Sequence, residues 1–287
     1  MRLGVIGDIH LCFDEVDVRQ LDEEGYDAIL VVGDLAAYSI KGGLGIAKLI
    51  ASLSTPTFVM PGNHDAAHVG QMAAEVLEAD ALIPLLNLGQ EQREADLAEA
   101  LRPATLAGYS RHALPDGGRG LEMIAGRPHS AGGPRLAFRP HLEARFGVED
   151  LEDSVRTLSA LIDESDAEEL IFFAHNGPHG LGQKRDDIWG CDFRKEEGDF
   201  GDLDLERAIE HARRRGKRVR AVVAGHMHHA LRGGGHRRWQ LEKDGTLYLN
   251  AARVPRIFQR AGRTLRHHVE LRLEDDRAHA REVLRSE

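Results

Sequence analysis

The segment FVMPGNHDAAHVG, residues 58–70, passes from an apolar run to a polar cluster within a few residues. Phe58–Met60 has the pattern of a short buried strand, and the Pro-Gly pair that follows it ends the strand. Asn63 and Asp65 suit a tight turn, because their side chains hydrogen-bond the local backbone. A turn does not explain His64 between them. The imidazole therefore indicates a role that depends on partners elsewhere in the chain.

The composition limits the class of protein. The chain has 287 residues, enough for one large domain or two small ones, and a net charge of −10. An acidic balance disfavours non-specific nucleic-acid binding, which requires a basic surface. Two cysteines, Cys12 and Cys191, provide no disulfide framework, and no apolar run approaches the length of a membrane span. We therefore expect a cytoplasmic protein with no membrane span.

Five short apolar runs, rich in Val, Ile and Phe, have the pattern of strands that are buried on both faces. They are Leu3–Ile6, Ala28–Val32, Phe58–Met60, Leu170–Ala174 and Ala221–Ala224. Helical patterns at 14–24 and 44–53 separate the first three runs. This alternation predicts a layered α/β fold with a mostly parallel central portion. Further helices are expected at 68–79, 90–101, 150–164 and 202–218.

The C-terminal part has an antiparallel pattern instead. The sequence Lys243-Asp244-Gly245 lies between two strand-like runs, which is a hairpin signal. The stretch HHVELRLED, residues 267–275, alternates apolar and charged side chains, as a half-exposed strand does. The segment 105–146 is rich in Gly, Pro and Arg and predicts loops and short strands. We expect residues 1–287 to form a single domain with a loop-rich insertion at about 105–146.

Each of the five apolar runs is followed by side chains that can bind a metal ion. These candidates are Asp8, His10, Asp34, Asn63, His175, His226 and His228. Taken singly, each is explained by a strand-end turn or a hydrogen-bonded histidine. Ligands of open α/β sheets bind at the carboxyl ends of strands, so the five ends are expected to converge. Such a cluster of polar groups is costly without a compensating ion.

The number and type of the candidate ligands indicate which ions they suit. Seven side chains are too many for one ion and suit two ions that share a carboxylate. Four imidazoles among oxygen donors favour Mn, Fe or Zn over Mg or Ca. We therefore expect two divalent metal ions as cofactors, with Mn as the ion that supports activity in vitro.

The motifs D-x-H, G-D, G-N-H-D, a downstream H and G-H-x-H, in this order, resemble those of the calcineurin-like metallophosphoesterases. They occur here as Asp8/His10, Gly33-Asp34, Gly62-Asn63-His64-Asp65, His175 and Gly225-His226-Met227-His228. The resemblance implies a four-layer α/β/β/α sandwich with mixed sheets. The segments GRPHSAGGPRLAF and HNGPHGLGQKRDDIWGCDF are also similar to a subgroup of this superfamily from photosynthetic organisms.

The resemblance also implies how the site is divided. One metal ion takes Asp8, His10, Asp34 and His228, and the other takes Asp34, Asn63, His175 and His226. Asp34 then bridges the ions, and a hydroxide between them attacks a phosphomonoester or phosphodiester. His64 is left over from coordination and protonates the leaving oxygen, which accounts for the imidazole in the opening segment.

One part of the family pattern is missing. Many relatives carry an acidic residue shortly after G-D, and it orients the catalytic histidine. Here the run is Leu35-Ala36-Ala37-Tyr38. Asp65 is one candidate for the same task, and its alternative role is that of a turn carboxylate.

Two other functions are compatible with the motifs. Some relatives are nucleases, and basic stretches at 211–220 and 232–238 offer positive charge to DNA or RNA. Other relatives are non-catalytic metal-binding scaffolds, but these lose ligands, and every motif ligand is present here. A dinucleotide enzyme is disfavoured, because GGLGIAK at 42–48 fails the G-x-G-x-x-G pattern.

We expect a small or medium phosphoester as substrate rather than nucleic acid. The acidic balance of the chain contrasts with a local supply of arginines in the segment 105–146. Arginine recognises phosphate with two parallel hydrogen bonds, and Arg111 and Arg127 are our candidates for substrate binding. The sequence carries no signal for an oligomeric partner.

Overall fold

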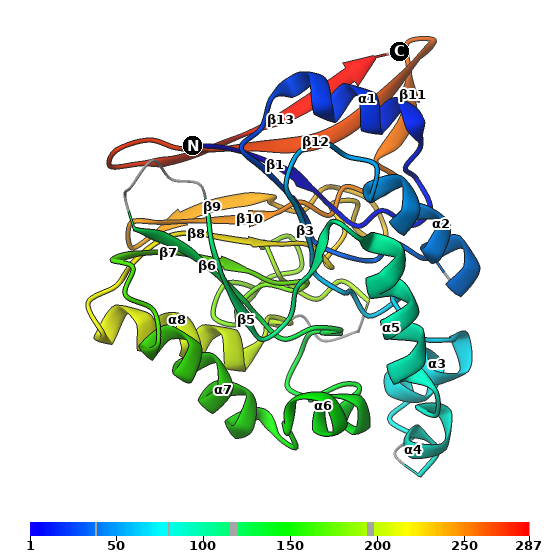
Figure 1. Ribbon diagram of the computed structural model, residues 1–287, viewed down its shortest axis with the longest axis vertical. Coiled ribbons are helices and arrows are strands. Elements are labelled where there is room, and N and C mark those ends of the chain that lie inside the picture. The colour runs from blue at the N-terminus through cyan, green and yellow to red at the C-terminus, as the bar shows by residue number, and fades with distance from the viewer. Residues whose placement is uncertain (38, 80, 115–119, 194–197, 287) are drawn as a thin grey trace.

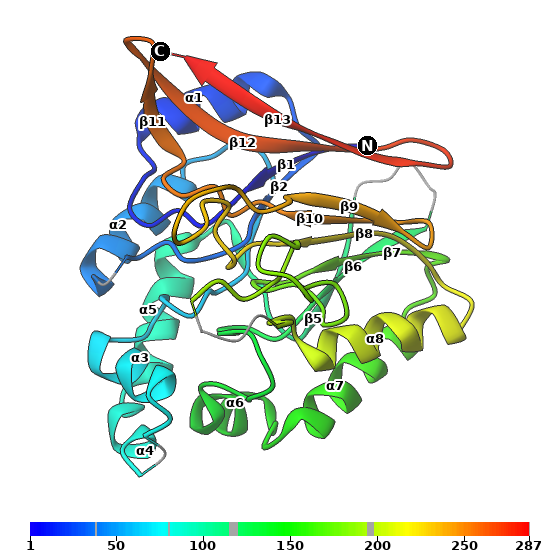
Figure 2. The same cartoon turned by 180° about the vertical axis from the view of Figure 1, so that it is seen from behind.

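The computed structural model describes residues 1–37, 39–79, 81–114, 120–193 and 198–286. Two mixed β-sheets face one another at its centre, and helices cover the outer face of each sheet (Figures 1 and 2). This arrangement confirms the predicted four-layer α/β/β/α fold class. No helix among these residues is long and apolar enough to cross a membrane.

The first sheet joins the N-terminal strands to the C-terminal ones. In the described residues its order is β11-β12-β1-β2-β3-β4, with β13 paired to β12. The strands are β1 (Arg2–Ile6), β2 (Ala28–Val31), β3 (Thr57–Val59), β4 (Thr105–Leu106), β11 (Ile257–Arg260), β12 (Arg263–Leu273) and β13 (Ala278–Ser286). Neighbours from β1 to β4 are parallel, whereas β11, β12 and β13 are antiparallel additions. The sheet therefore ends antiparallel, as the alternation at 267–275 predicts.

The second sheet has the order β5-β6-β7-β8-β10-β9. Its strands are β5 (Ser110–Ala113), β6 (Leu121–Ala125), β7 (Glu169–Phe173), β8 (Arg218–Ala224), β9 (Gln240–Lys243) and β10 (Thr246–Asn250). The four central strands are parallel, and β5 and β9 are antiparallel edges. Asp244 and Gly245, which join β9 to β10, both have positive φ, as a two-residue hairpin turn requires.

The segment 105–146 is more regular than its composition suggests. It supplies β4, β5, β6 and the helix α6 (Arg139–Phe146), while its residues 115–119 lie outside the described part of the chain. β6 pairs with β7 along its whole length, so this segment builds part of the second sheet. The run Leu121–Ala125 lies between two glycines and has four apolar residues interrupted by Glu122, and the surrounding Gly and Pro residues obscured it.

The helices cover the sheets with one apolar face each. Buried residues of α1 (Glu15–Glu24), α2 (Ile40–Ile50) and α5 (Gln90–Leu101) pack on the first sheet. Those of α7 (Leu151–Asp163) and α8 (Leu203–Arg214) pack on the second. Along the chain, α3 (Val69–Val76) and α4 (Ile83–Leu86) come between α2 and α5.

Two of these helices are capped by the side chain of an aspartate. Asp14 accepts hydrogen bonds from the first turn of α1, and Asp150 does the same for α7. Such caps satisfy amide groups that have no partner inside the helix, and they set where each helix begins.

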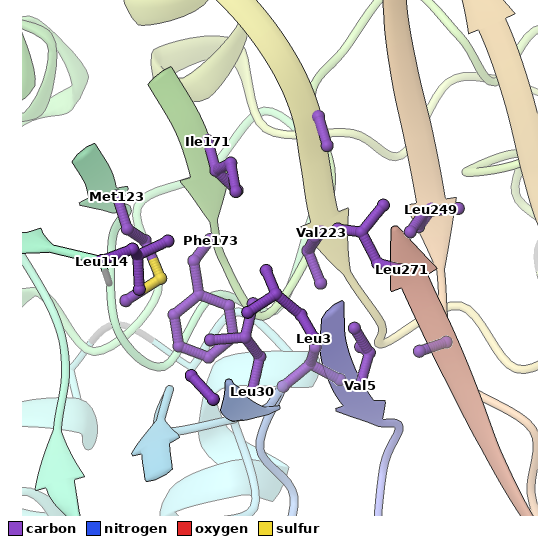
Figure 3. Close-up of a cluster of buried hydrophobic side chains, with 14 of the residues drawn as sticks. Leu3, Val5, Leu30, Leu114, Met123, Ile171, Phe173, Val223, Leu249 and Leu271 are labelled. Carbon is purple, nitrogen blue, oxygen red and sulfur yellow. The ribbon is translucent and has the colours of Figure 1, made fainter. Parts of the chain in front are cut away.

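The space between the two sheets is filled by apolar side chains from both (Figure 3). Leu3 and Leu30 of the first sheet meet Phe173 and Val223 of the second, and all four are wholly buried. Burial of this surface is the main favourable term in folding. It also holds the strand ends of the two sheets against each other.

Candidate metal centre

The seven predicted ligands lie in five loops that follow five strands. Asp8 and His10 follow β1, Asp34 follows β2, Asn63 follows β3, His175 follows β7, and His226 and His228 follow β8. Within the first sheet, the His10 amide donates to the Asp34 carbonyl at 2.7 Å. Across the sheets, the His226 amide donates to Asp8 Oδ1 at 3.1 Å. The structure brings all seven side chains together.

One group of ligand atoms comes from Asp8, His10 and His228. The Nε2 atoms of His10 and His228 lie 3.2 Å apart, and His228 Nε2 is 3.5 Å from Asp8 Oδ2. Asp8 is wholly buried, and its Oδ2 has no hydrogen-bond partner among the described residues. A buried carboxylate oxygen in this position is costly unless a cation compensates it.

A second group comes from Asn63, His175 and His226. The Asn63 Oδ1 atom lies 3.0 Å from His175 Nε2 and 3.1 Å from His226 Nδ1, and these two nitrogens are 3.2 Å apart. The other ring nitrogen of His175, Nδ1, lies 2.6 Å from the Val32 carbonyl. A carbonyl only accepts, so Nδ1 carries the proton and Nε2 of the neutral ring presents a lone pair. Histidine ligands of metals are commonly fixed in this way.

The Asp34 carboxylate lies between the two groups. Its Oδ2 is 3.6 Å from His10 Nε2, and its Oδ1 is 3.6 Å from His175 Nε2. The His64 backbone amide donates to Oδ1 at 2.9 Å, which helps fix the rotamer of the carboxylate. One carboxylate thus faces both sets of imidazoles.

Burial and charge act in opposite directions on these groups. Burial lowers the pKa of His226 to about 3 and also lowers the pKa of His10. Burial acts the same way on His175 and His228, but the carboxylates of Asp34 and Asp8 outweigh it and raise both pKa values. The two carboxylates therefore favour the protonated forms of His175 and His228, while burial favours the neutral forms of His10 and His226.

The model of the family described as calcineurin-like phosphoesterase matches residues 1–230, a range that contains every one of these ligands. The chain belongs to the calcineurin-like phosphoesterase family. A comparison with curated protein sequences gave no match.

Several solved structures share the fold of this chain at low sequence identity. A dimetal phosphatase from Danio rerio has 12% identity and a TM-score of 0.54, with 99% of this chain and 98% of that chain covered. TT1561 of Thermus thermophilus has 12% identity and a TM-score of 0.52, with coverage of 98% and 97%. A hypothetical protein of the same bacterium has 15% identity and a TM-score of 0.50, with both chains fully covered. At these identities the likeness shows the fold alone.

Two glycines of the family motifs are required by close approach of the loops. A Cβ atom on Gly62 would overlap Asp34 Oδ1 and the His175 ring, and one on Gly225 would overlap Asp8 Oδ1. Only glycine allows the backbone so near to these carboxylates. In the sequence these residues mark strand ends, and the structure adds that they make room for the ligands.

His64 of the phosphoesterase motif is held by a backbone group. Its Nδ1 donates to the Ala37 carbonyl at 2.5 Å, and its Nε2 lies 3.8 Å from Asp34 Oδ2. The Ala37 carbonyl therefore fixes the orientation of this ring, the task that the resemblance assigns to an acidic residue. Sequence reasoning missed it, because a backbone carbonyl has no residue-type signal. Tyr38, the next residue, lies outside the described part of the chain.

The Asp65 carboxylate is hydrogen-bonded to backbone amides of two loops. Its Oδ1 accepts from the Ala36 amide at 3.2 Å, and its Oδ2 accepts from the Gly62 amide at 2.9 Å. Burial and the nearby Asp34 charge raise the pKa of Asp65 to about 6. Of the two roles considered for Asp65, these contacts match the turn carboxylate, which ties the loop after β3 to the loop after β2.

The two candidate substrate arginines lie in ion pairs. Arg127 is 2% exposed, with Nε 2.8 Å from Asp204 Oδ2 and a second nitrogen 3.1 Å from Asp202 Oδ1. Its guanidinium is enclosed and cannot reach a substrate, which corrects the expectation for Arg127. Arg111 on β5 is partly exposed and pairs with Glu122 of β6 at 2.8 Å. A substrate contact by Arg111 stays a prediction.

Proposed function

We propose that this protein is a dinuclear metal-dependent phosphoesterase that hydrolyses a phosphomonoester or a phosphodiester. The observation that carries the proposal is the position of the Asp34 carboxylate, with one oxygen toward His10 and the other toward His175. A carboxylate shared by two sets of imidazoles is what a pair of ions requires. The family to which the chain belongs is consistent with this reaction class.

The residues present fit two divalent cations. One ion would be held by Asp8, His10, Asp34 and His228, and the other by Asp34, Asn63, His175 and His226. Two observations support this division: the buried Asp8 Oδ2 has no hydrogen-bond partner among the described residues, and ring nitrogens approach one another closely. The donor set, with four imidazoles, favours Mn, Fe or Zn. When bound, two such ions supply Lewis acidity to the phosphoryl group and to the attacking water.

The side chains of the protein supply the remaining steps. His64 would donate a proton from Nε2 to the oxygen of the leaving group, since its Nδ1 proton is held by the Ala37 carbonyl. Asp65 holds the loop that carries His64 through the Gly62 amide. This fixed geometry lowers the cost of orienting the acid toward the leaving group.

A small or medium phosphoester is the substrate class that we propose. The chain carries a net charge of −10, which opposes binding of a long polyanion but leaves room for local recognition of one phosphate.

We also propose a cytoplasmic location. Both cysteines, Cys12 and Cys191, are free thiols, in keeping with a reducing compartment.

The basic stretch 211–220 gives little support to the nuclease alternative. Arg215 pairs with Asp163 at 2.8 Å, and Arg218 pairs with Glu169 at 3.2 Å. Arg213 donates to Thr246 on the neighbouring strand β10. Carboxylates and hydroxyls of the same domain thus occupy much of this positive charge.

A panel of phosphoesters tests the proposal. Purified protein loaded with Mn²⁺ would be assayed against phosphomonoesters, phosphodiesters, single-stranded RNA and duplex DNA. We expect turnover of at least one small ester that a chelator abolishes. Full metal content without any turnover would favour the scaffold alternative, and preferential cleavage of nucleic acid would favour the nuclease alternative.

A further inference from the structure

The seven candidate ligands described above form what we call the Asp34 centre. A second cluster of side chains that can bind a metal ion lies outside it. It consists of Glu94 on α5, His129 in the loop after β6, and His141 on α6. All three are buried, with exposed fractions of 2%, 0% and 0%. Glu94 Oε2 lies 3.0 Å from His129 Nε2 and 2.5 Å from His141 Nε2. In Figures 1 and 2, α6 lies next to the group formed by α3, α4 and α5, and α6 contacts α5 directly.

The hydrogen bonding of His129 leaves a lone pair inside this cluster. Its Nδ1 lies 3.0 Å from the Gly62 carbonyl, which only accepts, so Nδ1 carries a proton. In the neutral ring, Nε2 is then an acceptor that faces a second acceptor, the Glu94 carboxylate. Two buried acceptors 3.0 Å apart need a positive charge between them, which either a metal ion or a second proton on the ring supplies.

His141 supports the same conclusion by a different observation. Its Nε2 is close to Glu94 Oε2, yet neither of its ring nitrogens makes a hydrogen bond among the described residues. Two atoms that bind the same metal ion lie close together in this way without forming a hydrogen bond to each other. Arg145 Nε binds the other carboxylate oxygen, Oε1, at 3.0 Å and so leaves Oε2 to the imidazoles.

The His129 ring is held by a backbone carbonyl, as the His175 ring is in the Asp34 centre. There, His175 is fixed through Nδ1 by the Val32 carbonyl and presents Nε2 to its neighbours. Here, His129 is fixed through Nδ1 by the Gly62 carbonyl in the same manner. Such backbone acceptors behind a histidine are a regular feature of metal sites.

The cluster is also closed to solvent by aromatic rings. The Phe138 ring packs against His129, and the Phe146 ring packs against His141. Gln90 lies one turn before Glu94 on α5 and is wholly buried, and its amide oxygen accepts a hydrogen bond from Gln71.

We propose that Glu94, His129 and His141 bind a third divalent metal ion. Two imidazoles and one carboxylate oxygen favour Zn, Mn or Fe over Mg or Ca. The ion would link α5, α6 and the loop after β6, and through the Gly62 carbonyl it would brace the loop that carries Asn63. Its role is structural, and it does not depend on the proposed phosphoesterase activity.

Metal counting by elemental analysis tests this inference without an activity assay. The protein would be stripped with a chelator, reloaded with Zn²⁺ or Mn²⁺, and freed of excess metal. We expect three ions per wild-type chain and two in His141→Ala. The control His211→Ala removes a partly exposed histidine that pairs with Asp163 on the outer surface, and it should keep three. Two ions in wild type, with no loss in His141→Ala, would overturn the proposal.

A second measurement covers the case in which His141→Ala does not fold. Co²⁺ would be loaded into wild type, Asp34→Asn and Glu94→Gln, and the visible absorption of the bound ion would be recorded. We expect Asp34→Asn to keep bands from an ion with histidine ligands and Glu94→Gln to lose that contribution. Absence of any bound Co²⁺ in folded Asp34→Asn would show that the cluster holds a proton and not a metal ion.

Discussion

The Oδ1 atom of Asp34 lies 3.6 Å from Nε2 of His175, although Asp34 follows a strand of the first sheet and His175 follows a strand of the second. The candidate centre therefore exists only when the two sheets pack face to face. The apolar core between them, which includes Leu30 and Phe173, sets the spacing of these loops. Protein interiors are close-packed, so this spacing resists small changes elsewhere.

Replacement of His64 by alanine should separate acid catalysis from metal binding. His64→Ala should keep its full metal content and lose about 10²–10⁴-fold in rate, the usual contribution of general acid–base catalysis. The loss should be smaller for esters of 4-nitrophenol, because a good leaving group needs less protonation. Rates on good and poor leaving groups, measured with elemental analysis, check this. An equal loss on both would argue against the acid role.

Metal affinity at the Asp34 centre should rise with pH. In the metal-free protein the pKa values of His175 and His228 are raised: burial lowers them, but Asp34 and Asp8 outweigh burial. A cation binds only neutral imidazole, so protons compete below these pKa values and cease to compete above them.

Calorimetric titration with Mn²⁺ checks this expectation. Affinity should increase between about pH 6 and 8, and heats in buffers of different ionisation enthalpy should reveal proton release. Affinity that is constant over this range, with no proton released, would contradict it. The variant His211→Ala, remote from the centre, should behave as wild type.

The Gly62 backbone should tolerate no side chain. A Cβ atom there would overlap Asp34 Oδ1 and the His175 ring, so Gly62→Ala should lower the metal content while the fold persists. Gly45 on α2 is the matched control, because an added Cβ meets nothing within 4 Å. Gly45→Ala should keep the metal and gain about 0.5–1 kcal/mol in stability. Unchanged metal content in Gly62→Ala would show that the loops can move apart.

Loss of the Arg127 guanidinium should destabilise the fold. Arg127→Met leaves the buried carboxylates of Asp202 and Asp204 without their cation, which costs about 3–5 kcal/mol for a broken buried pair. Arg111→Ala breaks a partly exposed pair with Glu122 and should cost about 0–1 kcal/mol. Chemical denaturation of both variants measures the difference. Equal stability of the two would mean that the buried pair contributes little.

The strand ends could be predicted because they carry two local signals at once. A short apolar run predicts each strand, and the polar residues directly after it predict ligands at its carboxyl end. The loops after β1, β2, β3, β7 and β8 follow this pattern without exception. The position of Asp34 between two sets of imidazoles could not be predicted from the residues, because it depends on how the two sheets pack.

Other features leave no local trace in the sequence. β6 lies among Gly and Pro residues, and its place beside β7 is a long-range pairing. His64 is oriented by the Ala37 carbonyl, a group that every residue type possesses. Arg127 resembles a phosphate-binding arginine until its pairing with Asp202 is seen. Each of these depends on contacts between segments that are distant in the chain.

Parallel assays of wild type and Asp34→Asn, as Mn²⁺ is added to the metal-free proteins, test the dinuclear phosphoesterase proposal most directly. Bound metal and hydrolysis of 4-nitrophenyl phosphate and bis(4-nitrophenyl) phosphate would be measured together. We expect wild type to hydrolyse at least one ester only when Mn²⁺ is bound. Asp34→Asn should bind less metal and lose nearly all turnover, since both ions lose a shared ligand. Full metal content and normal turnover in Asp34→Asn would contradict the proposal.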